Sequence, residues 1–336
     1  MPSHLSLARQ HDAAGRHDDA INSLALGTQA GDPACTRELG KRLLTGDRAP
    51  LLAAEGAGFL AEAAGKGDAE ATARMATLTA LGLYTNQSWG EALRWLTLAE
   101  ERGWQPARGQ LAALANDRAQ DPAAWQMSPA VHDLSTNPRV SVVDGFLGAS
   151  VCDWIIEHAR GRLVRARVYD AANETTLVTT TRTNSVANSN LGEVELLELL
   201  VQARMSAACG LPMRNMEAPA VLHYARGQQI TEHYDFVDPQ TPDYDKELAR
   251  NGQRVVTFLV YLNDDYDGGE TGFPTLGVNH KGRRGQGLFF VNALPNLQPD
   301  LRMVHTGQPP TRGEKWIVSQ FIRSRPTIAT PAPLRR

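Results

Sequence analysis

The first third of the 336-residue chain contains apolar, alanine-rich stretches at helical spacing, separated by short polar segments with glycine. Three of these segments begin at Gly31, Gly67 and Gly103, at a constant offset of 36 residues. The same shift aligns the leucine that lies seven residues before each glycine. A period near 36 residues predicts pairs of helices, in which Gly67 and Gly103 adopt the left-handed conformation that ends a helix.

This pattern resembles the tetratricopeptide class of helical repeats and its Sel-like relatives. We therefore expect three stacked helix pairs over about residues 8–120 and assign residues 1–120 to an all-α repeat region. An irregular alanine-rich bundle is the alternative.

From residue 140 onward the pattern changes to short β-type segments. Residues 140–143 predict a strand, residues 149–162 predict an amphipathic helix, and residues 194–209 fit a second helix. Further strands are expected at 220–224, 254–262, 287–291, 302–305 and 315–322. Short strands separated by glycine- and proline-rich turns are typical of a sandwich or barrel, so we expect an α+β multidomain protein and no doubly wound parallel sheet.

Two segments interrupt this organisation. Three prolines and a polar stretch indicate a linker at 121–138, which leaves residues 139–326 as the strand-rich domain. Residues 327–336 contain too few apolar side chains to pack, and we expect a disordered tail.

Composition narrows the functional classes. The chain has 34 basic and 37 acidic residues, without the basic excess that nucleic-acid binding favours. No apolar run is long enough for a membrane span, and the first 16 residues lack the apolar core of a secretory signal, so we expect a cytoplasmic protein. Three widely spaced cysteines argue against both disulfides and a zinc site.

One group of residues suggests metal chemistry. His233 and Asp235 share a face if they lie on a strand, whereas the similar pair His17 and Asp19 lies in a predicted helix. His305 falls in a later predicted strand, and Lys315 follows ten residues further on. Two imidazoles and one carboxylate are the ligand set that holds non-haem Fe(II) with open coordination positions. A lysine can hold the distal carboxylate of a co-substrate.

Five sequence blocks in order carry a resemblance to a known family. Together they resemble the 2-oxoglutarate and Fe(II)-dependent oxygenases of the prolyl 4-hydroxylase type, over about residues 138–325. The blocks are Leu222–Gln228, His233–Asp235, Gln253–Asn263, Gly268–Pro274 and His305–Trp316.

The resemblance implies a double-stranded β-helix, or jelly-roll, barrel with flanking helices. It implies that His233, Asp235 and His305 bind Fe(II) and that Lys315 pairs with the far carboxylate of 2-oxoglutarate. O2 is then the second co-substrate, and ascorbate is a candidate reductant.

Three further residues follow from the same resemblance. Tyr224 and Tyr261 would hydrogen-bond 2-oxoglutarate, although both could equally be core aromatics. Arg182 lies in a segment that resembles part of the family's substrate groove, and the alternative is a surface salt bridge.

The expected reaction is hydroxylation of an aliphatic carbon, with decarboxylation of 2-oxoglutarate to succinate and CO2. A peptidyl proline is the preferred target, and the helical repeat would cradle the peptide. Two alternatives stay open. The substrate could be a free amino acid or small natural product, with Arg182, Arg254 and Arg284 as the charged groups, or the chain could be a non-catalytic scaffold or sensor whose repeat binds a partner. The oligomeric state is open.

Overall fold

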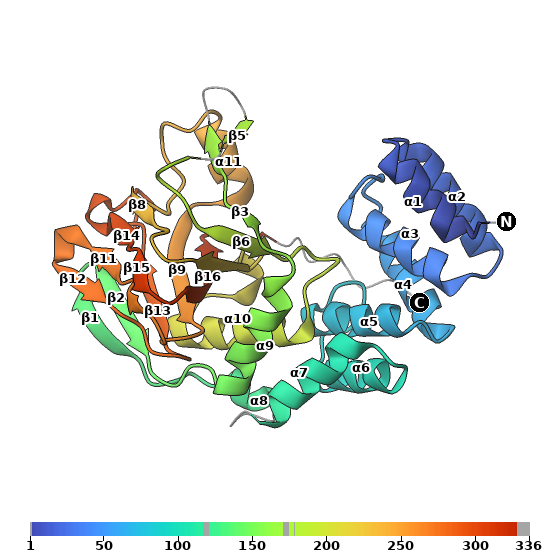
Figure 1. The fold of residues 1–336 in the computed structure, drawn as a ribbon, viewed down its shortest axis with the longest axis horizontal. Helices are drawn as coiled ribbons and strands as arrows, with labels where there is room; N and C mark the ends of the chain where they lie inside the picture. Colours follow the sequence, from blue (N-terminus) through green and yellow to red (C-terminus); the bar gives the residue numbers. More distant parts are fainter. Residues whose placement is uncertain (1, 117–120, 171–174, 178, 328–336) are drawn as a thin grey trace. The chain divides into compact units, whose positions relative to one another are not determined.

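The computed structural model describes residues 2–116, 121–170, 175–177 and 179–327 (Figure 1). Within these residues the chain forms two compact units. One consists of the residues up to 112 together with Ser189–Leu199, and the other of 113–188 and the residues from 200 onward. None of the helices in the described part of the chain combines the length and the apolar character that crossing a membrane requires.

The first unit is built from helices, drawn in blue to teal in Figure 1. They are α1 (His4–Ala13), α2 (His17–Gln29), α3 (Pro33–Thr45), α4 (Ala53–Gly65), α5 (Ala69–Leu81), α6 (Trp89–Glu101) and α7 (Gln105–Ala115). Helices α2, α4 and α6 begin at positions 17, 53 and 89, and α3, α5 and α7 begin at 33, 69 and 105. The structure therefore confirms a helical repeat with a period of 36 residues.

Glycines separate the two helices of each pair, as the sequence predicts. Gly31, Gly67 and Gly103 have φ angles of 83°, 91° and 90°, in the left-handed region. An aspartate follows Gly31 and Gly67 and caps the N-terminus of the next helix. Asp32 accepts from the backbone N–H of Ala34, and Asp68 accepts from that of Ala71. One Gly-Asp pair thus ends one helix and begins the next.

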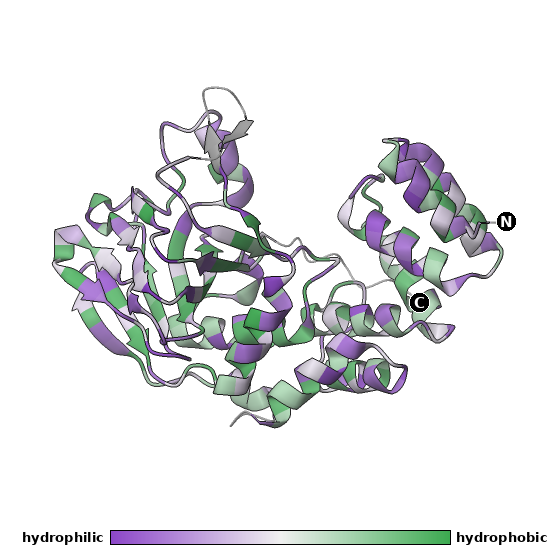
Figure 2. Cartoon of the chain, viewed as in Figure 1, coloured by the Kyte–Doolittle hydropathy of each residue, from purple (hydrophilic) through white to green (hydrophobic). Residues whose placement is uncertain are grey.

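The repeat buries its periodic positions. Leu24, Leu60 and Leu96 are fully buried, and hydrophobic and hydrophilic residues alternate along the helices of the repeat (Figure 2). Helices α3 and α4 touch through their backbones, since a Cβ atom at Gly56 would overlap the backbone of Leu44. Small residues at this crossing are therefore a packing requirement.

The segment Ser189–Leu199 packs with the repeat, although it lies far from it in sequence. Arg74 forms a buried ion pair with Glu195. Gln110 donates to the other oxygen of Glu195 at 2.6 Å and accepts from the Leu197 N–H at 3.0 Å. Buried polar groups from two distant parts of the chain satisfy one another here.

The second unit contains two main antiparallel sheets. The larger has the strand order β1-β2-β13-β9-β16-β7-β6-β3, and the smaller has the order β12-β11-β14-β8. The larger comprises β1 (His132–Thr136), β2 (Arg139–Val143), β13 (Gly287–Val291), β9 (Arg254–Tyr261), β16 (Lys315–Arg323), β7 (Ala220–Tyr224), β6 (Ser185–Asn188) and β3 (Val164–Arg165). The smaller comprises β12 (Val278–His280), β11 (Thr271–Phe273), β14 (His305–Gly307) and β8 (Ile230–His233). Two-stranded ribbons join β10 (Asp267–Gly268) to β15 (Pro310–Arg312) and β4 (Val168–Asp170) to β5 (Thr175–Leu177).

A shared core joins the two sheets. Leu259 and Ile317 from the larger sheet pack in one cluster with Phe273 from the smaller sheet. Two helices flank the sheets, α9 (Ala149–Arg160) and α10 (Leu196–Cys209). The predicted jelly-roll thus consists of two open antiparallel sheets with flanking helices (Figure 1).

The predicted elements agree with the structure in most places. Strands β7 and β13 have the predicted bounds, whereas the strand expected at 302–305 is a 3-10 turn, η3 (Leu301–Met303), followed by β14. The segment 121–138, for which we expected a linker, contains the short helix α8 (Pro122–Trp125) and strand β1. Cys35, Cys152 and Cys209 are free thiols, and the first two are buried. Residues 328–336, the larger part of the expected tail, lie outside the described residues.

Candidate metal centre

Two histidines far apart in sequence meet across neighbouring strands. His233 is the last residue of β8, and His305 is the first residue of β14. These strands pair antiparallel, and the two histidines are direct partners in the register. Their ring centroids are 4.2 Å apart. The sheet therefore places both imidazoles at one point, as the sequence motif led us to expect.

Asp235 completes this cluster. Strand β8 ends at His233, so Asp235 lies beyond the strand and the shared-face argument does not apply to it. The carboxylate nevertheless reaches both rings, at 3.6 Å from His233 Nε2 and 3.2 Å from His305 Nε2. The ligand atoms of the three residues all lie within 4.8 Å of one another. Within the described residues they form a cluster of the size that one metal ion needs.

The orientation of the histidines fits a metal ion. His233 Nδ1 lies 2.8 Å from the carbonyl oxygen of Thr231, and His305 Nδ1 lies 3.0 Å from that of Met303. A ring nitrogen next to a carbonyl oxygen must carry the proton and donate it, which leaves Nε2 with a free lone pair when the ring is neutral. This backbone arrangement commonly supports metal-binding histidines.

A hydrogen-bond chain fixes the carboxylate. The Thr257 hydroxyl donates to Asp235 Oδ2 at 2.8 Å, and the Asn292 amide donates to the Thr257 oxygen at 2.9 Å. All three side chains are buried. The Asn292 amide occupies a lone pair of the Thr257 hydroxyl oxygen, so the hydroxyl proton of Thr257 points to the Asp235 carboxylate.

The electrostatics of the cluster reflect the close approach of its members. Burial alone would raise the pKa of Asp235, but the adjacent His305 and His233 hold it well below its usual range. Burial, aided by the neighbouring His305, lowers the pKa of His233. Burial would also lower the pKa of His305, but the Asp235 carboxylate outweighs it and raises this pKa. A carboxylate thus stays ionised beside two imidazoles, as a divalent cation requires.

Lys315 lies fully buried in the same cavity. Its Nζ donates to the carbonyl oxygen of Gly269 at 2.8 Å and lies 5.1 Å from the centroid of the Tyr224 ring. An ammonium group has three donors, and this is the one hydrogen bond that the described residues provide. Burial lowers the pKa of Lys315 to about 7. The remaining donors and the unpaired charge fit the carboxylate of a bound acid.

Gly269 is required for this arrangement. Its φ angle is 72°, and a Cβ atom there would lie 2.8 Å from the Tyr266 ring. Any other residue would strain the turn that aims the carbonyl oxygen at Lys315.

The two predicted co-substrate tyrosines differ in their surroundings. Tyr224 lines the cavity, and its hydroxyl has no hydrogen-bond partner within the described residues. The Tyr261 hydroxyl is instead bonded to Thr271 Oγ1 at 2.8 Å, and it is Thr271 that lines the cavity. Sequence reasoning missed Thr271, although it lies inside one of the five matching blocks.

The cavity has a volume of about 740 Å³. The larger sheet forms one wall, because alternate residues of β16 and β7 face it, among them Lys315, Ile317 and Leu222. Arg182 and Arg254 also line it. The cavity is large enough for a small acid and part of a further ligand.

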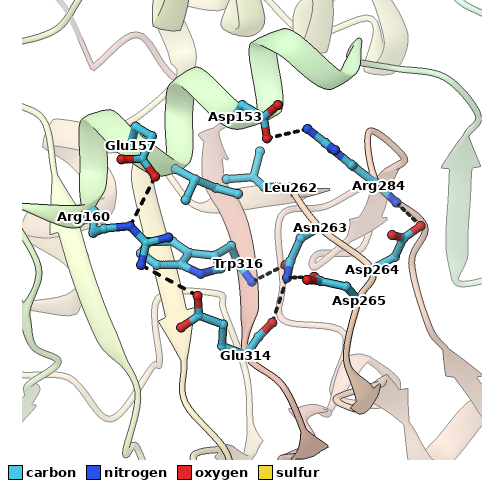
Figure 3. Close-up of a pocket in the computed structure, with 11 residues that line it drawn as sticks. Asp153, Glu157, Arg160, Leu262, Asn263, Asp264, Asp265, Arg284, Glu314 and Trp316 are labelled. Carbon is cyan, nitrogen blue, oxygen red and sulfur yellow. Dashed lines mark hydrogen bonds and ion pairs between the residues drawn. The ribbon is translucent and has the colours of Figure 1, made fainter.

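A second pocket, of about 400 Å³, contains Arg284 (Figure 3). Its charged groups pair with one another, as in Arg284 with Asp153 and Arg160 with Glu314. Trp316 lines this pocket, while its neighbours in sequence, Lys315 and Ile317, line the metal cavity. Arg284 therefore does not line the cavity that holds the cluster, although we had considered it as a charged clamp.

Comparison with known proteins agrees with this site. Residues 219–323 match the family model of the 2OG-Fe(II) oxygenase superfamily. The chain is 31% identical over 210 residues to probable prolyl 4-hydroxylase 7 of Arabidopsis thaliana, covering 57% of this chain and 65% of that protein. It is also 31% identical over 213 residues to prolyl 4-hydroxylase 2 of the same plant, covering 57% and 69%.

A solved structure also aligns with the chain. The viral collagen prolyl hydroxylase vCPH from Paramecium bursaria Chlorella virus-1, in its 2OG complex, is 28% identical with a TM-score of 0.43. The alignment covers 55% of this chain and 96% of that one. On the family match and the two plant relatives, the chain belongs to the 2-oxoglutarate and Fe(II)-dependent oxygenase superfamily, among the relatives of the prolyl 4-hydroxylases.

Proposed function

We propose that this protein is a dioxygenase that uses Fe(II), 2-oxoglutarate and O2 to hydroxylate an aliphatic carbon of a peptidyl residue, with proline as the preferred target. The observation that carries the proposal is the meeting of His233, Asp235 and His305 in one cavity with the buried Lys315. The names of the plant relatives support proline as the residue oxidised.

The proposed roles follow from the chemistry of each group. His233, Asp235 and His305 would hold Fe(II), which with 2-oxoglutarate and O2 supplies the oxidising power and yields succinate and CO2. Lys315 would pair with the far carboxylate of the keto acid, and Tyr224 would donate its hydroxyl proton to the same molecule. Burial raises the pKa of Tyr224, which keeps that proton in place at neutral pH.

Tyr261 has an indirect role in this proposal. Its hydroxyl is hydrogen-bonded to Thr271, so it would orient the threonine hydroxyl that lines the cavity. Thr271 rather than Tyr261 would then contact the co-substrate.

The helical repeat is the proposed cradle for a longer peptide. Stacked helix pairs present extended surfaces on which peptides bind. If the repeat takes part, KM should fall as a substrate peptide is lengthened beyond the segment that the cavity can hold. Equal KM values over a series of lengths would assign the repeat another role.

A turnover assay tests the function. The protein is mixed with Fe(II), 2-oxoglutarate, ascorbate and a panel of proline-containing peptides, and succinate and peptide mass are measured. We expect succinate together with a mass gain of one oxygen atom, about 16 Da, on a proline. If the protein turns over free amino acids or small natural products but no peptide, its substrate is a small molecule and the proposed peptide substrate is wrong.

A scaffold or sensor without catalysis is the remaining alternative. Metal analysis of anaerobically purified protein, with a charge-transfer band that appears on adding 2-oxoglutarate, would support the enzyme. A His233→Ala variant that keeps both the metal and the band would contradict the ligand assignment.

A further inference from the structure

Four arginines line the cavity that contains the metal cluster, and Arg254 among them is paired with Glu217. We call the other three the arginine wall: Arg165, Arg167 and Arg182. Arg165, the last residue of β3, and Arg167 flank the buried Ala166, and both arginines line the cavity. Arg167 is exposed and the other two are half-buried, whereas Asp235 and His305 are buried. The wall therefore occupies the outer part of the cavity.

No carboxylate within the described residues pairs with the arginine wall. The acidic groups that line the cavity are Asp235 in the metal cluster, the exposed Glu232, and Glu217. Glu217 is already occupied, because Arg254 donates two hydrogen bonds to it and Arg323 donates a third. Among the described residues that line it, the outer part of the cavity thus carries an excess of positive charge.

Two members of the arginine wall are hydrogen-bonded to the same residue and still keep free donors. Arg182 Nε donates a hydrogen bond to the side-chain oxygen of Asn184 at 3.3 Å, and Arg165 Nη1 donates one to the backbone carbonyl oxygen of Asn184 at 3.4 Å. Asn184 is fully buried. Both guanidinium groups therefore share one rigid anchor and still present N–H groups that the described residues do not use.

The charge of Arg182 reaches the metal cluster. It contributes to lowering the pKa of both His233 and Tyr224, so its guanidinium lies within electrostatic range of the centre. A group bound by Arg182 would therefore lie within electrostatic range of the metal cluster.

We propose that the arginine wall selects acidic peptides, by binding two or more carboxylates that flank the oxidised residue. The proposal rests on the peptide-hydroxylase function given above. Guanidinium groups bind carboxylates through two parallel hydrogen bonds, and three guanidinium groups offer more N–H donors than one carboxylate can accept. A free amino acid, with its single carboxylate, would leave part of the wall unpaired.

Matched peptides test the proposal. Three versions of one proline-containing host peptide are compared. The residues that flank the proline are Asp and Glu in the acidic peptide, Asn and Gln in the amide peptide, and Lys in the lysine peptide. We expect kcat/KM to be about tenfold lower for each carboxylate removed, and the advantage of the acidic peptide to shrink as salt is raised. Equal kcat/KM for the acidic and amide peptides would overturn the proposal while leaving the peptide hydroxylase intact.

Charge reversal identifies the residues. Arg167→Glu should lower kcat/KM for the acidic peptide and raise it for the lysine peptide. Arg312→Gln, which breaks an exposed ion pair with Asp267, is the control and should leave the preference for the acidic peptide unchanged. Arg165→Gln should reduce the preference without reversing it. A preference that is unchanged in Arg167→Glu and Arg165→Gln contradicts the arginine wall.

A binding measurement separates the two possible failures. Peptide affinity is measured with Mn(II) and 2-oxoglutarate in the full-length protein, so that no turnover is needed. Selective binding of acidic peptides without hydroxylation would support the wall and contradict the proposed reaction. Binding or turnover of free proline that depends on Arg165 and Arg167, with none for any peptide, would overturn the selection of acidic peptides.

Discussion

Lys315 should make the affinity for 2-oxoglutarate depend on pH. In the protein without ligand, burial lowers the pKa of this lysine to about 7. A bound carboxylate next to Nζ favours the charged ammonium and raises the same pKa. Binding therefore takes up a proton, and the affinity must fall as the pH rises through 7.

The size of this effect follows from the pKa. With a pKa of about 7, roughly nine tenths of the molecules carry the charged lysine at pH 6 and roughly one tenth at pH 8. If only the charged form binds, the dissociation constant rises about tenfold between these values, which is ~1.4 kcal/mol.

The assay is calorimetric titration of 2-oxoglutarate into the Mn(II)-loaded protein at several pH values, repeated in buffers of different ionisation enthalpy to count the protons taken up. The matched control is Lys315→Arg, because a guanidinium stays charged throughout this range. Histidines that compete with the metal at low pH affect both proteins equally.

The affinity of the Lys315→Arg protein for 2-oxoglutarate should change much less with pH. Fewer protons should be taken up on binding to this variant than on binding to the wild-type protein. Identical pH profiles for Lys315 and for the Lys315→Arg protein would refute this account of the lysine. A Lys315→Met protein should lose most of its 2-oxoglutarate affinity.

Three other substitutions test the supports of the site and of the repeat. Thr257→Val removes the hydrogen bond to the carboxylate ligand and should weaken metal binding about 10- to 100-fold by competitive chelator titration, while Thr257→Ser should keep it; equal losses in both would mean that the hydroxyl is not the cause. Gly269→Ala forces a side chain into a left-handed turn and should lower the free energy of unfolding by about 1–3 kcal/mol in urea denaturation, and an unchanged urea midpoint would count against the strain. Glu195→Ala leaves Arg74 buried without its partner and should cost about 3–5 kcal/mol, against under ~1 kcal/mol for Glu62→Ala at an exposed pair; equal losses would show that burial does not strengthen this contact.

The repeat was predictable because its signal is local. A glycine followed by aspartate both ends one helix and begins the next, and the spacing of Gly31 and Gly67 gives the period directly. The attachment of Ser189–Leu199 to the repeat was not predictable, since it depends on buried side chains such as Arg74 and Glu195 that are far apart in sequence.

The metal cluster could be proposed from its motif, but its geometry could not. The direct pairing of His233 with His305 is a matter of strand register, which depends on how the whole smaller sheet packs. The same holds for Thr257 in β9 and Asn292 directly after β13, which are ordinary polar residues until the fold brings them into hydrogen-bond contact.

Tyr261 and Arg284 illustrate the limits of reading single residues. Tyr261 lies in the expected strand, yet its hydroxyl points at Thr271. Arg284 lies in a turn beside the second pocket, where Asp153 pairs with it. A sequence pattern gives the face of a strand, but the partner of a long polar side chain depends on the packing of neighbouring elements.

Anomalous diffraction from crystals grown with Mn(II) and 2-oxoglutarate would test the central claim most directly. The account predicts one metal peak within bonding distance of His233 Nε2, His305 Nε2 and the Asp235 carboxylate, with the far carboxylate of the keto acid at Lys315 Nζ. A metal peak elsewhere, or a keto acid bound away from Lys315, would contradict it.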